Sequence, residues 1–564
     1  MPSGTDPLLA RADGMADAAV DHRGLPAERG ATGGWRSALF IIAVEIAERF
    51  AFYGVSSNLI SYLTGPLGEG TAAAAAAINA WNGVAQLLPL LGGALADKWL
   101  GRYRTIVMAS LLYVLGLGML AFSTFLSSGG HHQCTTTAGG QACAPSTLQV
   151  AFFYASLYIV AVAQGGHKPC VQAFGADQFD QSDPKESVSR SSFFNWWYFG
   201  MCAGTAVTLV LLSYVQDNIG WGLGFGIPCA VMAAALAVFL LGTRTYRYYV
   251  TNAKGGLFAR AAEAFAEWRS RRKAGPLEQA SQERDRAAAE APRFSAGVDE
   301  EDQAVVSNAG FVKEAKAILR LFPIWATCLI YAVAFAQSST FFTKQAATLD
   351  RRIGDHFKVP PAALQSFISI TIVVFIPIYD RVIVPVSRRY SGKPSGITML
   401  QRIGAGMFLS LLSMVIAALV ETRRLRVARD TGLVDKPNVP LPMSLWWMVP
   451  QYVLFGAADV FTMVGLQEFF YDQVPDKLRS LGLALYLSIF GVGSFISSAL
   501  VSVIDRATTA RGQSWFSNNL NRGHVDYFYW LLAALSALEL LAYVFFAVIY
   551  KYKNKGAVHA SVAG

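Results

Sequence analysis

Long apolar runs alternate with short polar segments along almost the whole chain of 564 residues. Six apolar runs lie in the first half, centred on 38–63, 77–96, 105–126, 149–170, 194–215 and 220–242. Six more follow a long polar insert, centred on 319–342, 364–386, 397–420, 445–471, 481–504 and 527–550. A helix needs roughly 20 apolar residues to cross a bilayer. The pattern therefore predicts an all-α membrane protein with twelve transmembrane helices.

The polar insert separates the two sets of six helices. It contains the basic EWRSRRK stretch and the acidic DEEDQ stretch with little aliphatic content, which is typical of a partly disordered linker. The predicted organisation is a tail, a six-helix bundle, a cytosolic linker, a second six-helix bundle and a tail, over residues 1–36, 37–242, 243–318, 319–551 and 552–564. This plan resembles the major facilitator superfamily fold, in which two bundles rock about a central site.

Lys and Arg residues between the runs predict which ends face the cytosol. The segments after the second and fourth helices are basic, whereas those after the first, third and fifth lack both residues. Positively charged loops stay cytosolic, so we expect both termini in the cytosol. The second half obeys this rule less well, because alternation places the basic ETRRLRVAR run outside.

Composition excludes several classes of function. Hydrophobic residues make up 53% of the chain and charged residues only 15%, which is too apolar for two or three soluble domains. The formal charge of +9 lies mostly in the loops, where it suits anionic lipid headgroups rather than nucleic acid. Only His167 of the seven histidines falls in an apolar run, and no metal-ligand or acyltransferase spacing is present. We therefore expect no enzyme activity, no metal and no nucleic-acid partner.

The cysteines divide into two groups. Cys134 and Cys143 lie together in the polar segment 127–147, which lacks Lys and Arg and so is expected to face away from the cytosol. A disulfide between them is one hypothesis and two free thiols the other. Small apolar packing is the usual role of the remaining four, which lie in or at the end of apolar runs: Cys170, Cys202, Cys229 and Cys328.

A tight turn between the second and third helices carries GALADKWLGRYR, which places Asp97, Arg102 and Arg104 at one helix end. Its spacing resembles the loop motif of the major facilitator superfamily. A glycine-permitted turn brings a carboxylate and two guanidinium groups together, and their charge-assisted hydrogen bonds would latch one arrangement of the helices. A merely basic loop is the alternative interpretation.

The first helix contains EIAERFAFYG, in which Glu45, Glu48, Arg49 and Tyr53 share one face at 100° per residue. Charges within an apolar helix are costly in lipid, so these must face the bundle interior and pair there. Lys168, deep in the fourth helix, needs a counter-charge, and Glu45 or Glu48 is the expected partner. The cluster is either a structural ion-pair network or a device that couples proton binding to substrate binding.

Several motifs together resemble the proton-dependent oligopeptide transporter family. They are the E-x-x-E-R group, the K-P-C end of the fourth helix, FGADQFD and FFNWWYFG. ERFAFYGVSSNLISYLTGPLG, STFFTKQAATLDR and GLQEFFYDQVPDKLRSLG are similar to the plant nitrate/peptide branch, and the amino-terminal segment resembles its fifth subfamily. The resemblance covers nearly the whole chain. It implies that Glu45, Glu48, Arg49 and Lys168 couple protons, that Arg49 and Lys168 bind a substrate anion, and that Tyr53 lines the pocket.

Further roles and two departures follow from the same resemblance. Gln337 would line the pocket, and Glu468 on the tenth helix would hold a positive group of the substrate or an inter-bundle contact. Asp459 lies nine residues earlier, on the opposite face of that helix, and is expected to be structural. Ser56 stands where bacterial relatives often have a second Arg, which weakens clamping of peptide carboxylates. Phe335 stands where a plant nitrate transporter has a nitrate-binding His.

The function that these residues imply is proton-coupled symport of small solutes by alternating access, with protons as the coupling ion and no cofactor. Nitrate, di- and tripeptides and other small anionic or zwitterionic metabolites all stay open as substrates. The alternatives are an uncoupled facilitator or a transporter-receptor of the same fold. Thr105 matches a regulatory phosphothreonine of plant nitrate transporters, which would add a kinase as partner. An ordinary uncharged residue at a helix N-terminus is the alternative interpretation. The plasma membrane and the vacuolar membrane both stay open.

Overall fold

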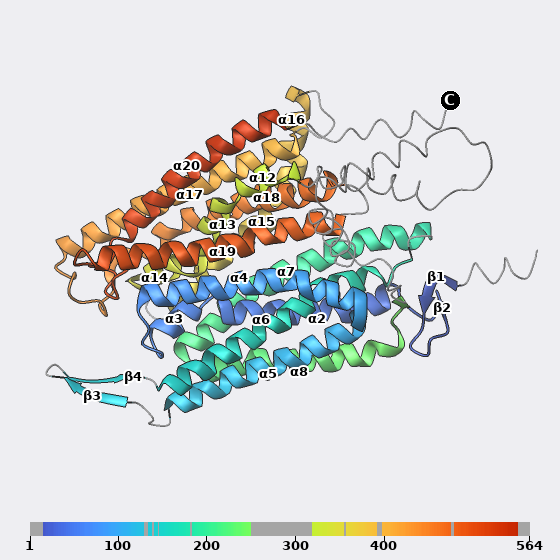
Figure 1. Cartoon of the computed structure of the whole chain (residues 1–564), viewed down its shortest axis with the longest axis horizontal. Helices are drawn as coiled ribbons and strands as arrows, with labels where there is room; N and C mark the ends of the chain where they lie inside the picture. The colour runs from blue at the N-terminus through green and yellow to red at the C-terminus, as the bar shows by residue number, and fades with distance from the viewer. Residues whose placement is uncertain are drawn as a thin grey trace, which may run out of the picture.

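The computed structural model describes residues 15–128, 133–137, 140–144, 146–180, 183–249, 319–354, 357–391, 397–474 and 479–550. Within these ranges, two bundles of long helices lie side by side, the first coloured blue to green and the second yellow to red (Figure 1). The predicted linker covers residues 243–318, of which 250–318 lie outside the described residues, as does the predicted carboxy-terminal tail of residues 552–564.

The first bundle contains six long helices and one short one. The short helix α3 (Leu59–Thr64) follows α2. The long helices are α2 (Gly34–Ser56), α4 (Thr71–Leu95), which continues as η1 (Ala96–Leu100), α5 (Arg102–Ser128), α6 (Thr147–Ala176), α7 (Pro184–Asn218) and α8 (Trp221–Leu241), which ends in η2 (Gly242–Arg244).

The second bundle is less regular, because several of its spans are built from consecutive shorter helices. The first of these spans is α12 (Phe322–Ala326), α13 (Leu329–Ala336), η3 (Gln337–Ser339) and α14 (Phe341–Ala347). The next is η4 (Pro361–Gln365), α15 (Ser366–Ile378), η5 (Tyr379–Ile383) and α16 (Val384–Ser391). The others are α17 (Met399–Asp430), η6 (Leu445–Met448) with α18 (Val449–Asp472), α19 (Arg479–Thr509) and α20 (Val525–Ile549).

Ten spans in the described part of the chain are long and apolar enough to cross a membrane. Helices α2 and α4, 23 and 25 residues long, pack in the first bundle beside them. Helix α2 differs from the ten because it carries the charged triplet Glu45, Glu48 and Arg49 in its middle. The twelve long spans correspond to the twelve predicted runs, to within a few residues at most ends.

A buried carboxylate stabilises the break between α12 and α13. The chain leaves helical geometry at Cys328 (φ −107°, ψ 1°), which frees backbone N–H groups at the start of α13. Glu539 of α20 accepts hydrogen bonds from two of them, the N–H of Ile330 at 2.8 Å and of Tyr331 at 3.0 Å. An acid at a helix N-terminus also complements the helix dipole. The break orients Tyr331 toward the neighbouring helix α18.

Short strands mark the two ends of the molecule. At one end, here the tail end, β1 (Met15–Val20) pairs with β2 (Pro26–Glu28) and with β5 (Tyr248–Tyr249), in the order β2-β1-β5. At the other, the hairpin end, β3 (Gln133–Thr137) pairs with β4 (Gly140–Ala144) (Figure 1). That register sets Cys134 opposite Cys143, but their side chains lie outside the described residues and the disulfide stays a prediction. Two further pairs are β6 (Leu349–Asp350) with β9 (Leu441–Ser444) and β7 (Arg352–Ile353) with β8 (Phe357–Lys358).

The two bundles are joined by hydrogen bonds in the half of the molecule nearer the hairpin end. There α4 packs along α19, and Asn79 donates to the hydroxyl of Ser497 at 2.9 Å. Within the described residues, the other hydrogen bonds from bundle to bundle are Ser498 Oγ to Ala76 O, Lys344 Nζ to Thr64 Oγ1, Gln365 Nε2 to Ser57 O and Thr71 N to Asn518 Oδ1. The hairpin end is therefore closed.

Candidate functional site

Three charged side chains of α2 form a compact cluster inside the first bundle. The guanidinium of Arg49 contacts Glu45 Oε1 through Nε at 3.1 Å and Glu48 Oε2 through Nη2 at 2.5 Å. All three residues are at most 3% exposed. The spacing of one helical turn brings both carboxylates within reach of one guanidinium. The predicted pairing of these residues inside the bundle is what the structure shows.

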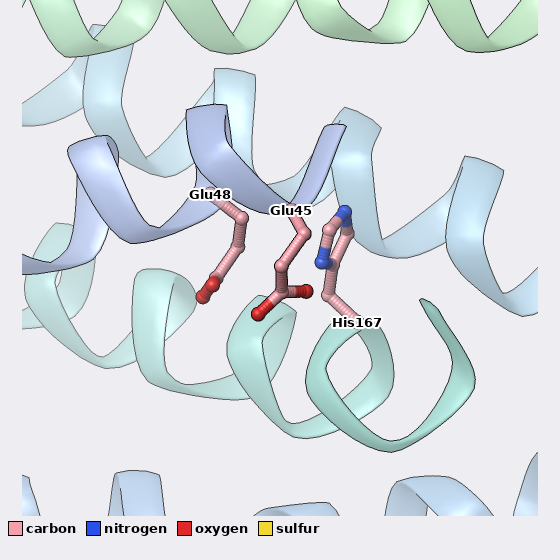
Figure 2. A group of neighbouring side chains, drawn as sticks. All are labelled: Glu45, Glu48 and His167. Carbon is pink, nitrogen blue, oxygen red and sulfur yellow. The ribbon is translucent and has the colours of Figure 1, made fainter. Parts of the chain in front are cut away.

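Two residues from neighbouring helices complete the cluster. Tyr113 of α5 donates its hydroxyl to Glu48 Oε1 at 2.6 Å. His167 of α6 is fully buried and meets the ring of Tyr113 edge-on, with centroids 5.9 Å apart. Figure 2 shows the carboxylates of Glu45 and Glu48 and the imidazole of His167 converging between α2 and α6, and one polar atom of each lies within 4.8 Å of the others. Zn²⁺ also takes such a donor set, but here Arg49 already pairs with both carboxylates.

Lys168 hydrogen-bonds to an uncharged residue rather than to the carboxylate that the sequence predicted as its partner. Its ammonium donates to the side-chain oxygen of Gln86 on α4 at 3.0 Å, while Arg49 takes the ion pairs with Glu45 and Glu48. Lys168 still lies within electrostatic range of all three charged residues of α2. The first bundle therefore presents two cations and two carboxylates in one buried region. Gln86 carries no charge and lies in an alanine- and leucine-rich run, so the sequence offered no signal for it.

The second bundle contributes one buried acid that faces this region. Asp459 of α18 is 2% exposed and accepts a hydrogen bond from the Tyr331 hydroxyl of α13. Tyr53 of the first bundle and Tyr486 of α19 are both close enough to interact electrostatically with the carboxyl group of Asp459. Tyr53 lies two turns beyond Glu45 on α2, so Asp459 approaches this helix from the second bundle. The expectation that Asp459 is structural stays a prediction. Its partner Tyr331 lies on a different helix, so the spacing along α18 could not reveal the contact.

The other predicted pocket residues are placed as follows. The side chain of Glu468 is 49% exposed and its nearest ionic partner is Arg402 of α17, at 3.8 Å. Gln337 is fully buried and donates to Ser497 Oγ at 2.9 Å, so its amide belongs to the closed hairpin end. Phe335 packs against Phe455 and Phe490, in an aromatic environment that offers no charge to an anion.

The latch motif holds two helices of the same bundle together. Arg102 Nη1 contacts Asp177 Oδ2 at 2.5 Å, where Asp177 belongs to the FGADQFD motif after α6. Gly101 adopts φ +75°, a left-handed conformation that favours glycine. Arg104 is exposed, and the side chain of Asp97 lies outside the described residues.

Thr105 lies in the first turn of α5, directly after the latch. It is 5% exposed and its hydroxyl donates to the carbonyl of Gly101 at 2.9 Å. A kinase would reach this hydroxyl only after the helix end opened.

Comparison with known proteins identifies the family. The model of the POT family matches residues 103–516. Protein NRT1/PTR FAMILY 5.10 of Arabidopsis thaliana is 57% identical over 541 residues, covering 95% of this chain and 96% of the relative. The chain belongs to the POT family. NRT1/PTR FAMILY 5.15 of the same plant is 51% identical over 549 residues, with 95% and 96% coverage. The predicted resemblance to the fifth subfamily of the plant nitrate/peptide branch is thus confirmed.

Solved structures support the same conclusion for the fold. The crystal structure of an auto-inhibited POT family peptide transporter matches with a TM-score of 0.68 at 22% identity, covering 92% of this chain and 98% of the other. The major facilitator fold predicted from the apolar runs is confirmed. As a POT family member, the protein is an integral multi-pass membrane transporter and not an enzyme.

Proposed function

We propose that this POT family transporter is a proton-coupled symporter of small anionic or zwitterionic solutes. The observation that carries the proposal is the buried cluster of Glu45, Glu48 and Arg49, two carboxylates on one guanidinium with almost no solvent contact. A facilitator needs no such group. Charged side chains in a membrane interior are expensive and are retained where they act on ions or protons.

The coupling follows from how one guanidinium is shared. With both carboxylates ionised, Arg49 is fully engaged by Glu45 and Glu48. Protonation of either carboxylate removes one of these charge-assisted contacts and frees part of the guanidinium fork for an anion. Nitrate or a substrate carboxylate then takes the vacated position, so proton and anion enter together. Lys168, whose ammonium donates to neutral Gln86, adds a second positive charge for the same anion.

The second bundle supplies the other half of the pocket. Asp459 of α18 is buried and is close enough to Tyr53 of α2 to interact with it electrostatically, which suits it to the positive group of a zwitterion. Glu468 stays a candidate for an inter-bundle contact, but its exposed side chain and its pairing with Arg402 favour Asp459 for the substrate. Nitrate, which has no positive group, would use Arg49 and Lys168 alone.

Alternating access is supported by the placement of the cross-bundle bonds. Asn79, Ser497 and Gln337 form a buried hydrogen-bonded group across the interface toward the hairpin end, and these bonds must break for that end to open. The positive-inside pattern predicts that the tail end lies in the cytosol, and we propose that the structure corresponds to a state closed to the other side. We propose the plasma membrane or the vacuolar membrane as its location, and a kinase acting on Thr105 as a regulator.

Current recordings in oocytes test the proposal. Cells expressing the protein are held at external pH 5.5 and 7.5 and given nitrate, dialanine or a panel of plant hormones. We expect an inward current with at least one solute that grows at pH 5.5 and is lost in Glu48→Gln, while Arg522→Gln, at an exposed ion pair, behaves as wild type. Uptake that does not depend on pH would indicate a facilitator, and binding without transport would indicate a receptor.

A further inference from the structure

His167 is a buried polar side chain without a partner. It has no exposed surface, and neither ring nitrogen makes a hydrogen bond within the described residues. Burying an imidazole in this way costs free energy, since at least one ring nitrogen is a donor and the other an acceptor in the neutral form. A short apolar side chain would pack in the same place without that cost. The arrangement therefore points to a use for the imidazole.

The groups around His167 are those of the coupling cluster. Glu45, Glu48 and Arg49 face it from α2, Tyr113 faces it from α5, and Lys168 follows it on its own helix α6. Two carboxylates lie near the imidazole: a polar atom of His167 lies within 4.8 Å of both Glu45 and Glu48 (Figure 2). A side-chain rotation or one bridging water spans this distance.

One carboxylate oxygen of the cluster has neither an ion-pair nor a hydrogen-bond partner within the described residues. Glu45 Oε1 is taken by Arg49, whereas Glu45 Oε2 is buried without a hydrogen-bond partner. On Glu48, Oε1 is taken by the hydroxyl of Tyr113 and Oε2 by Arg49. Glu45 Oε2 and the His167 imidazole are therefore an unpartnered acceptor and an unpartnered ring in the same buried region. A proton between them would satisfy both.

His167 also lies nearer the tail end than Glu48. The tail ends of α2 and α6 are level, because the N–H of Gly34 donates to the carbonyl of Gln178 at 2.7 Å. Glu48 follows Gly34 by fourteen residues and Glu45 by eleven, while His167 precedes Gln178 by eleven. At 1.5 Å per residue, Glu48 is about 21 Å from this level, whereas Glu45 and His167 are both about 16 Å from it. Glu45 and His167 thus lie at the same depth, one turn nearer the tail end than Glu48.

We propose that His167 is a further proton-binding residue of the coupling site, which takes the proton from Glu45 on its way to the tail end. This inference rests on the proposed proton coupling. In the step, the O–H bond at Glu45 Oε2 breaks and an N–H bond forms on the imidazole, leaving a carboxylate beside an imidazolium. The net charge of the cluster is unchanged, so the transfer requires no uncompensated charge in the bilayer. Glu45 then returns to Arg49, and the imidazolium releases its proton toward the tail end.

The test compares net proton-driven transport with exchange. In proteoliposomes with nitrate and dialanine as probes, uptake driven by a pH gradient requires proton release, whereas counterflow at equal pH does not. We expect His167→Gln to lower gradient-driven uptake at least tenfold while counterflow stays within about twofold of wild type. The control is His524→Gln, at the hairpin end beside Asp526, which should leave both unchanged. Unchanged gradient-driven uptake in His167→Gln overturns the inference.

Failure of the proposed function would give a different result, because uptake by the wild-type protein would then not depend on the pH gradient.

A second measurement tests the inference if His167→Gln does not fold. The six other histidines of the seven are replaced by Gln, and the ring of His167 is isotope-labelled for infrared spectroscopy with protons as the only probe. We expect its ring band to move between pH 8 and pH 4, and the movement to disappear in Glu45→Gln. A band that stays constant over this range contradicts a proton-binding role.

Discussion

Removal of Arg49 should destabilise the protein in a strongly pH-dependent way. The guanidinium lies 3.1 Å from Glu45 and 2.5 Å from Glu48, and all three residues are at most 3% exposed. Breaking a buried ion pair by deleting one partner typically costs about 3–5 kcal/mol, because the other charge is left buried alone. In Arg49→Ala two carboxylates are left together, and the protein will avoid the full cost by binding a proton.

The free energy of binding this proton sets the size of the destabilisation. Placing a proton on a glutamate of ordinary pKa, about 4.3, costs about 3.7 kcal/mol at pH 7 and about 1 kcal/mol at pH 5. A single proton shared by Glu45 and Glu48 leaves one negative charge, which Lys168 can balance. We therefore expect Arg49→Ala to lower the free energy of unfolding by about 3–4 kcal/mol at pH 7 and by only about 1 kcal/mol at pH 5.

Unfolding by SDS in mixed micelles, at both pH values, measures this difference. The double variant Glu48→Gln/Arg49→Ala removes one of the competing charges, so it should be more stable than Arg49→Ala at pH 7 and should depend less on pH. Arg522→Ala is the matched control, since its pair with Asp435 is exposed on both sides and is worth less than about 1 kcal/mol. Equal destabilisation of Arg49→Ala at pH 5 and pH 7 would refute the ion-pair interpretation.

Three other predictions concern the ends of the molecule. Ser497→Ala removes the acceptor of two buried donors, at about 1–3 kcal/mol, and should shift the population at least fivefold toward an open hairpin end in spin-label distance measurements. Arg102→Ala and Asp177→Asn break a partly exposed pair worth at most about 1 kcal/mol, so each should lower the melting temperature slightly and the double variant no further. Burial raises the pKa of Glu69 at the hairpin end, so its ionisation disfavours the folded state above that pKa; Glu69→Gln should raise the melting temperature at pH 8 but not at pH 4.

The helices could be predicted from the sequence because each membrane-spanning helix requires a long apolar run. A run of about 20 apolar residues is visible without any knowledge of its neighbours, and the six-plus-six division follows from one polar insert. The charged face of α2 was equally visible, since its partners lie within one turn of the same helix. Where both partners of an ion pair lie on the same helix, their spacing in the sequence is sufficient to predict the contact.

Contacts between helices could not be predicted in the same way. Asp459 acquires its partner Tyr331 only through the break before α13, and that break depends on Glu539 of α20. Lys168 was expected to pair with a carboxylate, but Arg49 is closer to both, and neutral Gln86 accepts its hydrogen bond instead. In each case the deciding group lies on a helix far away in the sequence.

The antiparallel strands at the tail end were also missed. Residues 1–36 were predicted as a cytosolic tail, yet β1 pairs with β2 and with β5, which follows the last helix of the first bundle. Fully buried Arg247 fixes this arrangement through Glu186 at 2.6 Å and the carbonyl of Gln178 at 3.1 Å. In the sequence, Arg247 was visible only as a basic residue after an apolar run. Such a pattern also fits an ordinary positive charge in a cytosolic loop.

The central claim is that proton movement and solute movement are one process through Glu48 and its neighbours. Simultaneous recording of internal pH and of solute uptake in proteoliposomes tests it most directly. We predict that nitrate or dialanine acidifies the vesicle interior in fixed proportion to its own uptake, and that Glu48→Gln abolishes both signals while equal-pH counterflow continues. Uptake without acidification, or acidification and uptake that persist in Glu48→Gln, would contradict the account.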